Sequence, residues 1–171
     1  MTHPLVDQLR FTRSEWLRAL DGVSDAEARR RFEPMNCISW MIGHLATQEN
    51  AYWVLWGQGK ELWPDLNKLV GFGSPPSTPP LEEMWAAWQD ITQAADTFLE
   101  SLTPEGLLTH LERNGQSRPE SIGTMLYRNI YHYWYHLGEA RAVRQLLGHT
   151  NLPEFVGDLG IKAPYRPGHQ R

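Results

Sequence analysis

Two histidines four residues apart, His132 and His136, are the residues of this chain best suited to metal chemistry. They occur in an aromatic, helix-forming stretch, residues 131–139, with the sequence YHYWYHLGE. Helical positions four apart are offset by only about 40° and lie about 5–6 Å apart, so both imidazoles can bind one divalent ion. A catalytic zinc site usually takes about three protein ligands and leaves one position open. The pair therefore predicts a third ligand elsewhere in the chain.

His44 is the best candidate for that ligand, because it lies in the other strongly helical and apolar segment, residues 38–48. Helical wheels place His44 in the middle of one apolar stripe and His132 in the middle of another. If the two stripes pack together, three imidazoles meet in an interior where an unpaired polar group costs about 1–3 kcal/mol. A lone histidine on an apolar face is more often a hydrogen-bonded core residue, whereas the set of three favours a metal site.

Glu139 is the carboxylate nearest to this set, three residues after His136 on the same helix face. It can orient an imidazole, act as a fourth ligand or serve as a catalytic base. A surface salt bridge with Arg128 or Arg141 is an alternative of equal weight. No glutamate directly follows His132, so the HExxH arrangement of metalloproteases, with its base on the same helix, is absent.

Two further polar residues share the faces of the histidines. Gln48, one turn after His44, can contact a bound water or substrate, or it can be an ordinary amide at the edge of the core. Arg128, one turn before His132, can receive an anionic group of a substrate, or it can be a solvated arginine. Glu49, in contrast, is about 140° from His44 around the helix and is expected to face elsewhere.

The elements that must position these residues are helical, which predicts an all-α fold. Hydrophobic periodicity predicts four long helices, with Ser39 as a plausible N-cap of the second and Gly57 as its stop. Ser24 and Glu27 have the spacing of a capping box that opens a short helical turn. The long helices are expected at about residues 4–20, 38–56, 81–102 and 121–147.

The connections are less regular. The long segment 57–80 ends in a Pro- and Gly-rich run, and in a helical bundle it can carry the chain from one end to the other. Residues 107–118 can form a small hairpin around Asn114-Gly115 or a plain loop. The tail, residues 149–171, can be pinned to the helices or to a second subunit by its apolar residues. These are Phe155, Val156, Leu159, Ile161 and Tyr165.

Composition limits the class of protein. A chain of 171 residues with 41% apolar residues and a net charge of -4 fits one domain, residues 1–171, without the basic surface that nucleic acids require. No uncharged run reaches the ~18 residues of a membrane span. The single cysteine, Cys37, suits a reducing cytoplasm. Most of the eight tryptophans are expected in the core. The other histidines, His3, His110, His149 and His169, are expected on the surface.

Three stretches together resemble the DinB-like, or YfiT-like, metalloenzyme superfamily. They read NCISWMIGHL at 36–45, HYWYHLGEA at 132–140 and RQLLGH at 144–149. The resemblance covers nearly the whole chain and implies a four-helix bundle with a long connection, 57–80, between its second and third helices. It also implies a homodimer and a histidine triad that holds a divalent metal, which maps onto His44, His132 and His136.

The resemblance implies a reaction class only broadly. Characterised relatives include metal-dependent transferases and isomerases that use low-molecular-weight thiols such as bacillithiol and mycothiol. We therefore expect a cytoplasmic enzyme that binds one divalent ion and a small-molecule substrate, with thiol-dependent S-transfer as the favoured reaction. Zinc is favoured, with nickel or iron as alternatives. A metal-dependent hydrolase with Glu139 as base, and a non-enzymatic metal- or small-molecule-binding helical module, are the two other hypotheses.

Overall fold

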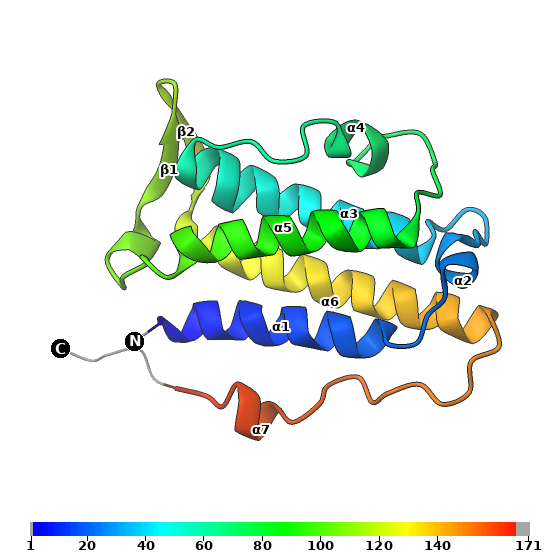
Figure 1. The fold of residues 1–171 in the computed structure, drawn as a ribbon. Coiled ribbons are helices and arrows are strands. Elements are labelled where there is room, and N and C mark those ends of the chain that lie inside the picture. The colour runs from blue at the N-terminus through cyan, green and yellow to red at the C-terminus, as the bar shows by residue number, and fades with distance from the viewer. Residues whose placement is uncertain (1, 167–171) are drawn as a thin grey trace.

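Four long helices lie side by side, as the hydrophobic pattern predicts (Figure 1). The computed structural model describes residues 2–166, and its long helices are α1 (Pro4–Leu20), α3 (Ile38–Glu49), α5 (Leu81–Leu99) and α6 (Ile122–Leu146). The most extensive packing joins α3 with α5 and α1 with α6. The protein is thus mostly helical, and α3 and α6, the helices that carry the three histidines, pack against each other.

Shorter elements occur between and after the long helices. The capping box of Ser24 and Glu27 is present and opens α2 (Asp25–Arg29). The connection 57–80 contains α4 (Leu66–Val70), the tail contains α7 (Leu159–Lys162), and a 3-10 turn, η2 (Gly106–Leu108), follows α5. None of these last three was predicted. Each is five residues or shorter, too short for hydrophobic periodicity to reveal.

The segment after η2 forms the hairpin, one of the two predicted alternatives, and so adds a small sheet to the expected all-α fold. Strands β1 (His110–Arg113) and β2 (Gln116–Ser121) are antiparallel, with Arg113 opposite Gln116. The two turn residues, Asn114 and Gly115, both have positive φ, 52° and 72°. Such a turn matches the twist of paired strands and favours Asn-Gly.

The second long helix differs from its prediction in two ways. Its N-cap is Cys37 and not Ser39, because Ser39 is already the second residue of the helix, where its buried hydroxyl contacts the Cys37 thiol at 3.3 Å. After Glu49 the helix continues to Trp56 as a π-helix, η1 (Asn50–Trp56). Wider turns of this kind often occur at functional sites. The apolar pattern predicts a continuous helix but not this change of pitch.

A charged and aromatic network lies buried between the four long helices. Arg13 of α1 forms an ion pair with Glu49 of α3, and both side chains are buried. The Tyr133 hydroxyl of α6 donates to Glu49 Oε1 at 2.7 Å and accepts from Trp88 Nε1 of α5 at 2.7 Å. Glu49 thus faces away from His44, as predicted, but into the core.

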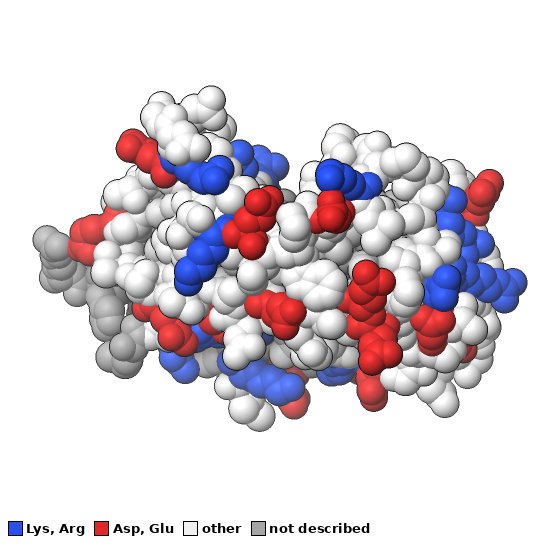
Figure 2. Space-filling view, turned by 45° about the horizontal axis from the view of Figure 1, so that its top comes forward, with Lys and Arg blue, Asp and Glu red and all other residues white. Residues whose placement is uncertain are grey.

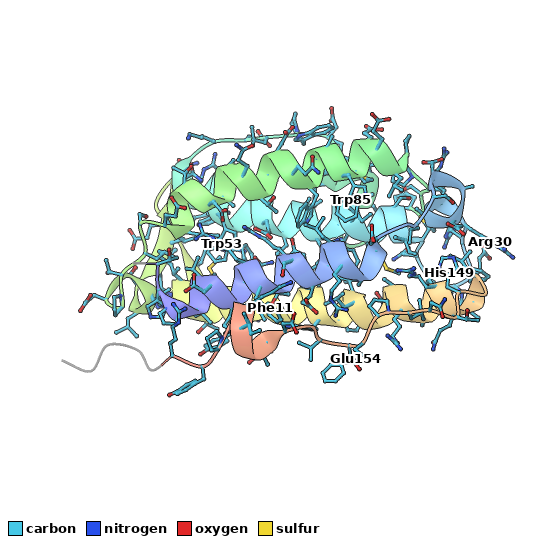
Figure 3. The ribbon with its side chains drawn as sticks, turned by 60° about the horizontal axis from the view of Figure 1, so that its bottom comes forward. Phe11, Arg30, Trp53, Trp85, His149 and Glu154 are labelled. Atoms are coloured by element: carbon cyan, nitrogen blue, oxygen red, sulfur yellow. The ribbon has the colours of Figure 1, made fainter. Side chains whose placement is uncertain are left out.

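The tryptophans belong to the core, as predicted. Trp53, labelled in Figure 3, is fully buried, stacks near Phe98 of α5 and donates its Nε1–H to Asn129 of α6. The remaining seven are buried or pack on the core in part. They are Trp16, Trp40, Trp56, Trp63, Trp85, Trp88 and Trp134.

The tail runs back along α1 after the end of α6 (Figures 1 and 3). Polar bonds attach it. Gly157 N–H donates to Glu15 at 2.7 Å, Arg18 donates to the Glu154 carbonyl, and Gln8 donates to the Ala163 carbonyl. The expectation that its apolar residues pin it to the helices is wrong for four of them, because these side chains are exposed to solvent. They are Phe155, Leu159, Ile161 and Tyr165.

His149 corrects another expectation. It is half-buried and not on the surface, because it contacts Glu27 of α2 at 3.0 Å and accepts from Arg144 of α6. His110 is exposed as predicted, and His3 is half-buried at the start of α1, where it accepts from the Leu5 N–H. His169 lies outside the described residues.

The surface mixes both signs of charge. Acidic and basic side chains alternate over the face shown in Figure 2, in accord with the small net charge of -4. In the described part of the chain, no helix combines the length and the apolar character that crossing a membrane demands.

Candidate metal centre

Three imidazoles converge where α3 packs against α6. His44 comes from α3, and His132 and His136 come from successive turns of α6. One ring nitrogen from each histidine lies within 4.8 Å of the other two. Among residues 2–166, this is a group of side chains that could hold a metal ion. Packing has brought together the pair and the third histidine that the sequence singles out.

The rings are arranged around a common point. The centroid of His44 is 4.9 Å from that of His132 and 5.2 Å from that of His136, and both contacts are edge-on. His132 Nε2 and His136 Nε2 are 3.0 Å apart. Two nitrogens bound to one tetrahedral zinc at about 2.0–2.1 Å are separated by about 3.3 Å, so only a small adjustment would admit an ion.

The other nitrogen of each ring has an oxygen partner. His44 Nδ1 is 2.8 Å from the Val70 carbonyl, His132 Nδ1 is 3.2 Å from Gln48 Oε1, and His136 Nδ1 is 2.6 Å from Glu139 Oε2. An acceptor at Nδ1 holds the proton there and leaves the Nε2 lone pair for a metal. All three Nε2 atoms are therefore left as candidate ligands.

The surroundings of His44 and His132 favour neutral imidazoles. Burial, together with the neighbouring His136 and His44, lowers the pKa of His132 to about 3. Burial also lowers the pKa of His44, although its contact with Val70 opposes that shift. Neutral imidazole is the form that binds a metal, so these two rings require no deprotonation at neutral pH.

Packed side chains support two of the rings. Trp40, one turn before His44 on α3, stacks on that ring with centroids 4.4 Å apart and an angle of 19°. Asn129, fully buried on α6, donates to Gln48 Oε1 at 3.0 Å and accepts from Trp53 Nε1 at 2.8 Å. The orientation of the Gln48 amide, and with it the His132 contact, thus depends on the core.

Glu139 and Arg128 occupy different surroundings. Contact with His136 lowers the pKa of Glu139 despite its partial burial, and a hydrogen bond with Tyr135 adds to this effect. Glu139 therefore lies beside an imidazole, with Oε2 2.6 Å from His136 Nδ1. Arg128 pairs with Glu120 of β2 at the edge of the site. Neither predicted surface salt bridge of Glu139 forms.

Sequence reasoning missed three residues around the centre. Val70 acts through its backbone carbonyl, which leaves no signal in the residue type. Asn129 is a polar residue three positions before His132, and its burial on α6 is visible only after packing. Trp40 is one of the tryptophans expected in the core, and its stacking on the His44 ring was not foreseen.

Comparison with known sequences identifies a family but no individual curated relative. The sequence profile of the DinB superfamily matches residues 8–140, a span that includes all three histidines. Among curated proteins, none matches the chain. The matched span covers most of the described residues and contains the histidine pair and the third histidine in the places that the resemblance implies. The chain belongs to the DinB superfamily.

Proposed function

We propose that this protein is a divalent-metal-dependent enzyme in which His44, His132 and His136 hold the ion. The observation that carries the proposal is the convergence of one ring nitrogen from each histidine to within 4.8 Å of the other two, while the Nδ1 of each ring lies beside an oxygen atom. Imidazole ligands suit zinc, which we favour, and they also accept nickel or iron.

The favoured reaction is thiol-dependent S-transfer. His44, His132 and His136 would hold the ion, which when bound would lower the pKa of a thiol by charge stabilisation. The sulfur then forms a bond to the electrophilic carbon of the second substrate, the bond from that carbon to its leaving group breaks, and the electron pair departs with that group. The thiol proton goes to solvent. The half-buried His132 is the ligand closest to that solvent, whereas His44 and His136 are buried.

A metal-dependent hydrolase is the enzymatic alternative and would use Glu139 as base. The observation that weighs against it is the contact of Glu139 with His136, because a carboxylate whose pKa is lowered is a weaker base. We assign Glu139 the role of orienting His136, and S-transfer, which needs no such base, is the better supported reaction.

Metal content is the first test. Tag-free wild-type protein should contain about one equivalent of metal by mass spectrometry, and His132→Ala should contain little. His110→Ala is the matched control, because His110 is exposed on the hairpin and does not belong to the group of three converging histidines. Equal metal in all three proteins, or none in the wild type, would contradict the assignment.

Conjugation of a simple electrophile tests the reaction. The metal-loaded wild type should form the thioether product only when a low-molecular-weight thiol is present, and His44→Ala should form it at the uncatalysed rate. Consumption of the electrophile without any thiol, with water in place of sulfur in the product, would overturn S-transfer in favour of hydrolysis.

A non-enzymatic metal- or small-molecule-binding module is the third hypothesis, and metal removal distinguishes it. The hydrophobic core does not include the three imidazole rings. A chelator should therefore leave the helical circular dichroism signal intact. It should lower Tm only modestly, because only the free energy of metal binding is lost. Unfolding on chelation would instead indicate a structural metal.

The wider setting of this enzyme is also a proposal. We propose that the four long helices form the four-helix bundle of one domain, residues 1–171, with 57–80 as its crossover connection. The enzyme acts in the cytoplasm as a homodimer on a small molecule, with no nucleic acid or membrane partner. The exposed aromatic and aliphatic side chains of the tail favour a second subunit.

A further inference from the structure

A groove of about 530 Å³ opens beside the histidine cluster. His132 and Gln48 line its inner end, so the groove is continuous with the candidate metal centre. Its outer wall carries three tyrosines, Tyr127, Tyr131 and Tyr135. They are spaced four residues apart along α6 and therefore project from one flank of that helix, next to the histidines.

All three tyrosines are largely exposed to solvent. Tyr127 and Tyr131 are near-parallel, with centroids 6.0 Å apart and an angle of 20°, and they are 51% and 65% exposed. Aromatic faces gain from being covered by another ring, and large exposed apolar side chains that gather in a groove indicate a binding site. The near-parallel tyrosine rings favour a ligand with a flat group.

The charge of the groove favours a neutral group. Its two charged side chains, Arg128 and Glu120, pair with each other. Each holds the other in its charged form: the bond from Arg128 lowers the pKa of Glu120, and Glu120 raises the pKa of Arg128. Arg128 is therefore not a free site for an anion, in contrast to the role that the sequence suggested.

We propose that this groove binds a neutral, planar ring carried by the substrate whose reacting atom lies at the three imidazoles. The inference rests on the proposed function, because the metal centre supplies the reaction, but ring binding itself depends on Tyr127 and Tyr131. These two are specificity-determining residues. Tyr135 bonds Glu139 and so also supports the metal centre.

Three thiols test the proposal on cobalt-loaded protein, in which thiolate binding is followed by visible absorption. Benzyl mercaptan should bind about 3- to 10-fold more tightly than ethanethiol, as expected for one stacking contact. The same ring with a carboxylate, 4-(mercaptomethyl)benzoate, should lose most of this gain. Tyr131→Ala and Tyr127→Ala should remove the preference for benzyl mercaptan without changing ethanethiol affinity.

Tyr165→Ala is the matched control, because Tyr165 is 89% exposed on the tail. It should keep the preference. No preference in the wild type, or a preference that persists in both groove variants, would overturn the proposal. The proposal would also be overturned if Tyr131→Ala changed the sedimentation coefficient of the protein but not its affinity for benzyl mercaptan. The tyrosines would then form an interface between two copies of the chain.

A second measurement separates the groove from the proposed reaction. Benzyl alcohol has the ring without the thiol, and saturation-transfer NMR should detect its binding to metal-free wild type but not to Tyr131→Ala. If benzyl alcohol binds in this way while no thiol binds the cobalt protein, the proposal that the groove binds a ring is supported and the proposed thiol-dependent reaction is contradicted. If benzyl alcohol does not bind, the groove proposal fails whatever the thiols do.

Discussion

At the residue scale, the Nδ1 of each imidazole lies beside one oxygen atom. Val70, Gln48 and Glu139 supply these contacts by three different chemical groups: a backbone carbonyl, an amide and a carboxylate. Only two of the three can be changed by side-chain substitution. Gln48 is the more informative, because it carries no charge and its own orientation is held by Asn129.

Gln48→Leu should weaken metal binding without abolishing it. The variant removes the acceptor for His132 Nδ1 and keeps a similar volume, and such outer partners typically change metal affinity by about 10- to 100-fold. Competition with a chromophoric chelator measures the affinity. Gln89→Leu, on the exposed side of α5, should bind as the wild type does. Equal affinity in both variants would show that Gln48 does not orient the ring.

Arg13 permits a test of the buried charges. Arg13→Met leaves Glu49 buried without its cation, and the free energy of unfolding should fall by about 3–5 kcal/mol in urea denaturation. Arg13→Met/Glu49→Met removes both charges and should recover much of that loss.

The control for this test is Arg29→Met. Arg29 pairs with Asp25 on the surface of α2, with 43% of its side chain exposed, so its loss should change stability by less than about 1 kcal/mol. If Arg13→Met cost no more than Arg29→Met, the pair between α1 and α3 would contribute little.

At the scale of elements, α4 matters to the metal centre because it brings the Val70 carbonyl to His44. Gly43 of α3 allows this approach. A methyl group on Gly43 would overlap Met84 Sδ and would lie 2.9 Å from Val70 Cγ2. The connection 57–80 is therefore more than a spacer, since its short helix packs directly against the helix that carries a candidate ligand.

Gly43→Ala should push α4 away from α3. We expect a loss of about 1–3 kcal/mol in the free energy of unfolding from overpacking, together with weaker metal binding. Gly138→Ala is the matched control in α6, where an added methyl meets nothing within 4 Å. That change should be neutral or stabilising by up to about 1 kcal/mol. If Gly43→Ala bound the metal as tightly as the wild type does, the position of α4 would not affect the metal centre.

At the scale of the whole molecule, the tail 149–166 is held to α1 by charge. Burial alone would raise the pKa of Glu15, but bonds from Arg18 and from the Gly157 N–H outweigh it and hold the pKa below its ordinary value. A carboxylate with a lowered folded-state pKa stabilises the fold above its unfolded pKa. That contribution is lost as the pH falls through the folded-state value.

Glu15→Gln should therefore be less stable than the wild type at about pH 7, and the difference should shrink as the pH falls below about 4. Urea unfolding at several pH values measures this, and limited proteolysis should cut the tail of the variant sooner. Glu61→Gln, in an exposed loop, should follow the wild type at every pH. A constant difference between Glu15→Gln and the wild type over this range would contradict the assignment.

Much of this protein follows from its sequence alone, because helices depend on local patterns. The spacing of His132 and His136 within one helix places both rings on one face before any packing occurs. The apolar periods give the four long helices, and Asn114-Gly115 suits the turn of the hairpin. Family membership, read from the residues around His44 and the histidine pair, is confirmed by the profile match over 8–140.

Only the tertiary structure decides contacts between residues distant in sequence. The Val70 carbonyl has no signature in its residue type, and the pairing of Arg128 with Glu120 needs β2 beside α6. The apolar residues of the tail were expected to hold it, yet polar bonds attach it, because the tail lies along a charged side of α1. Hydrophobic patterns specify which face of an element is buried, whereas the partner of each polar atom depends on which elements meet.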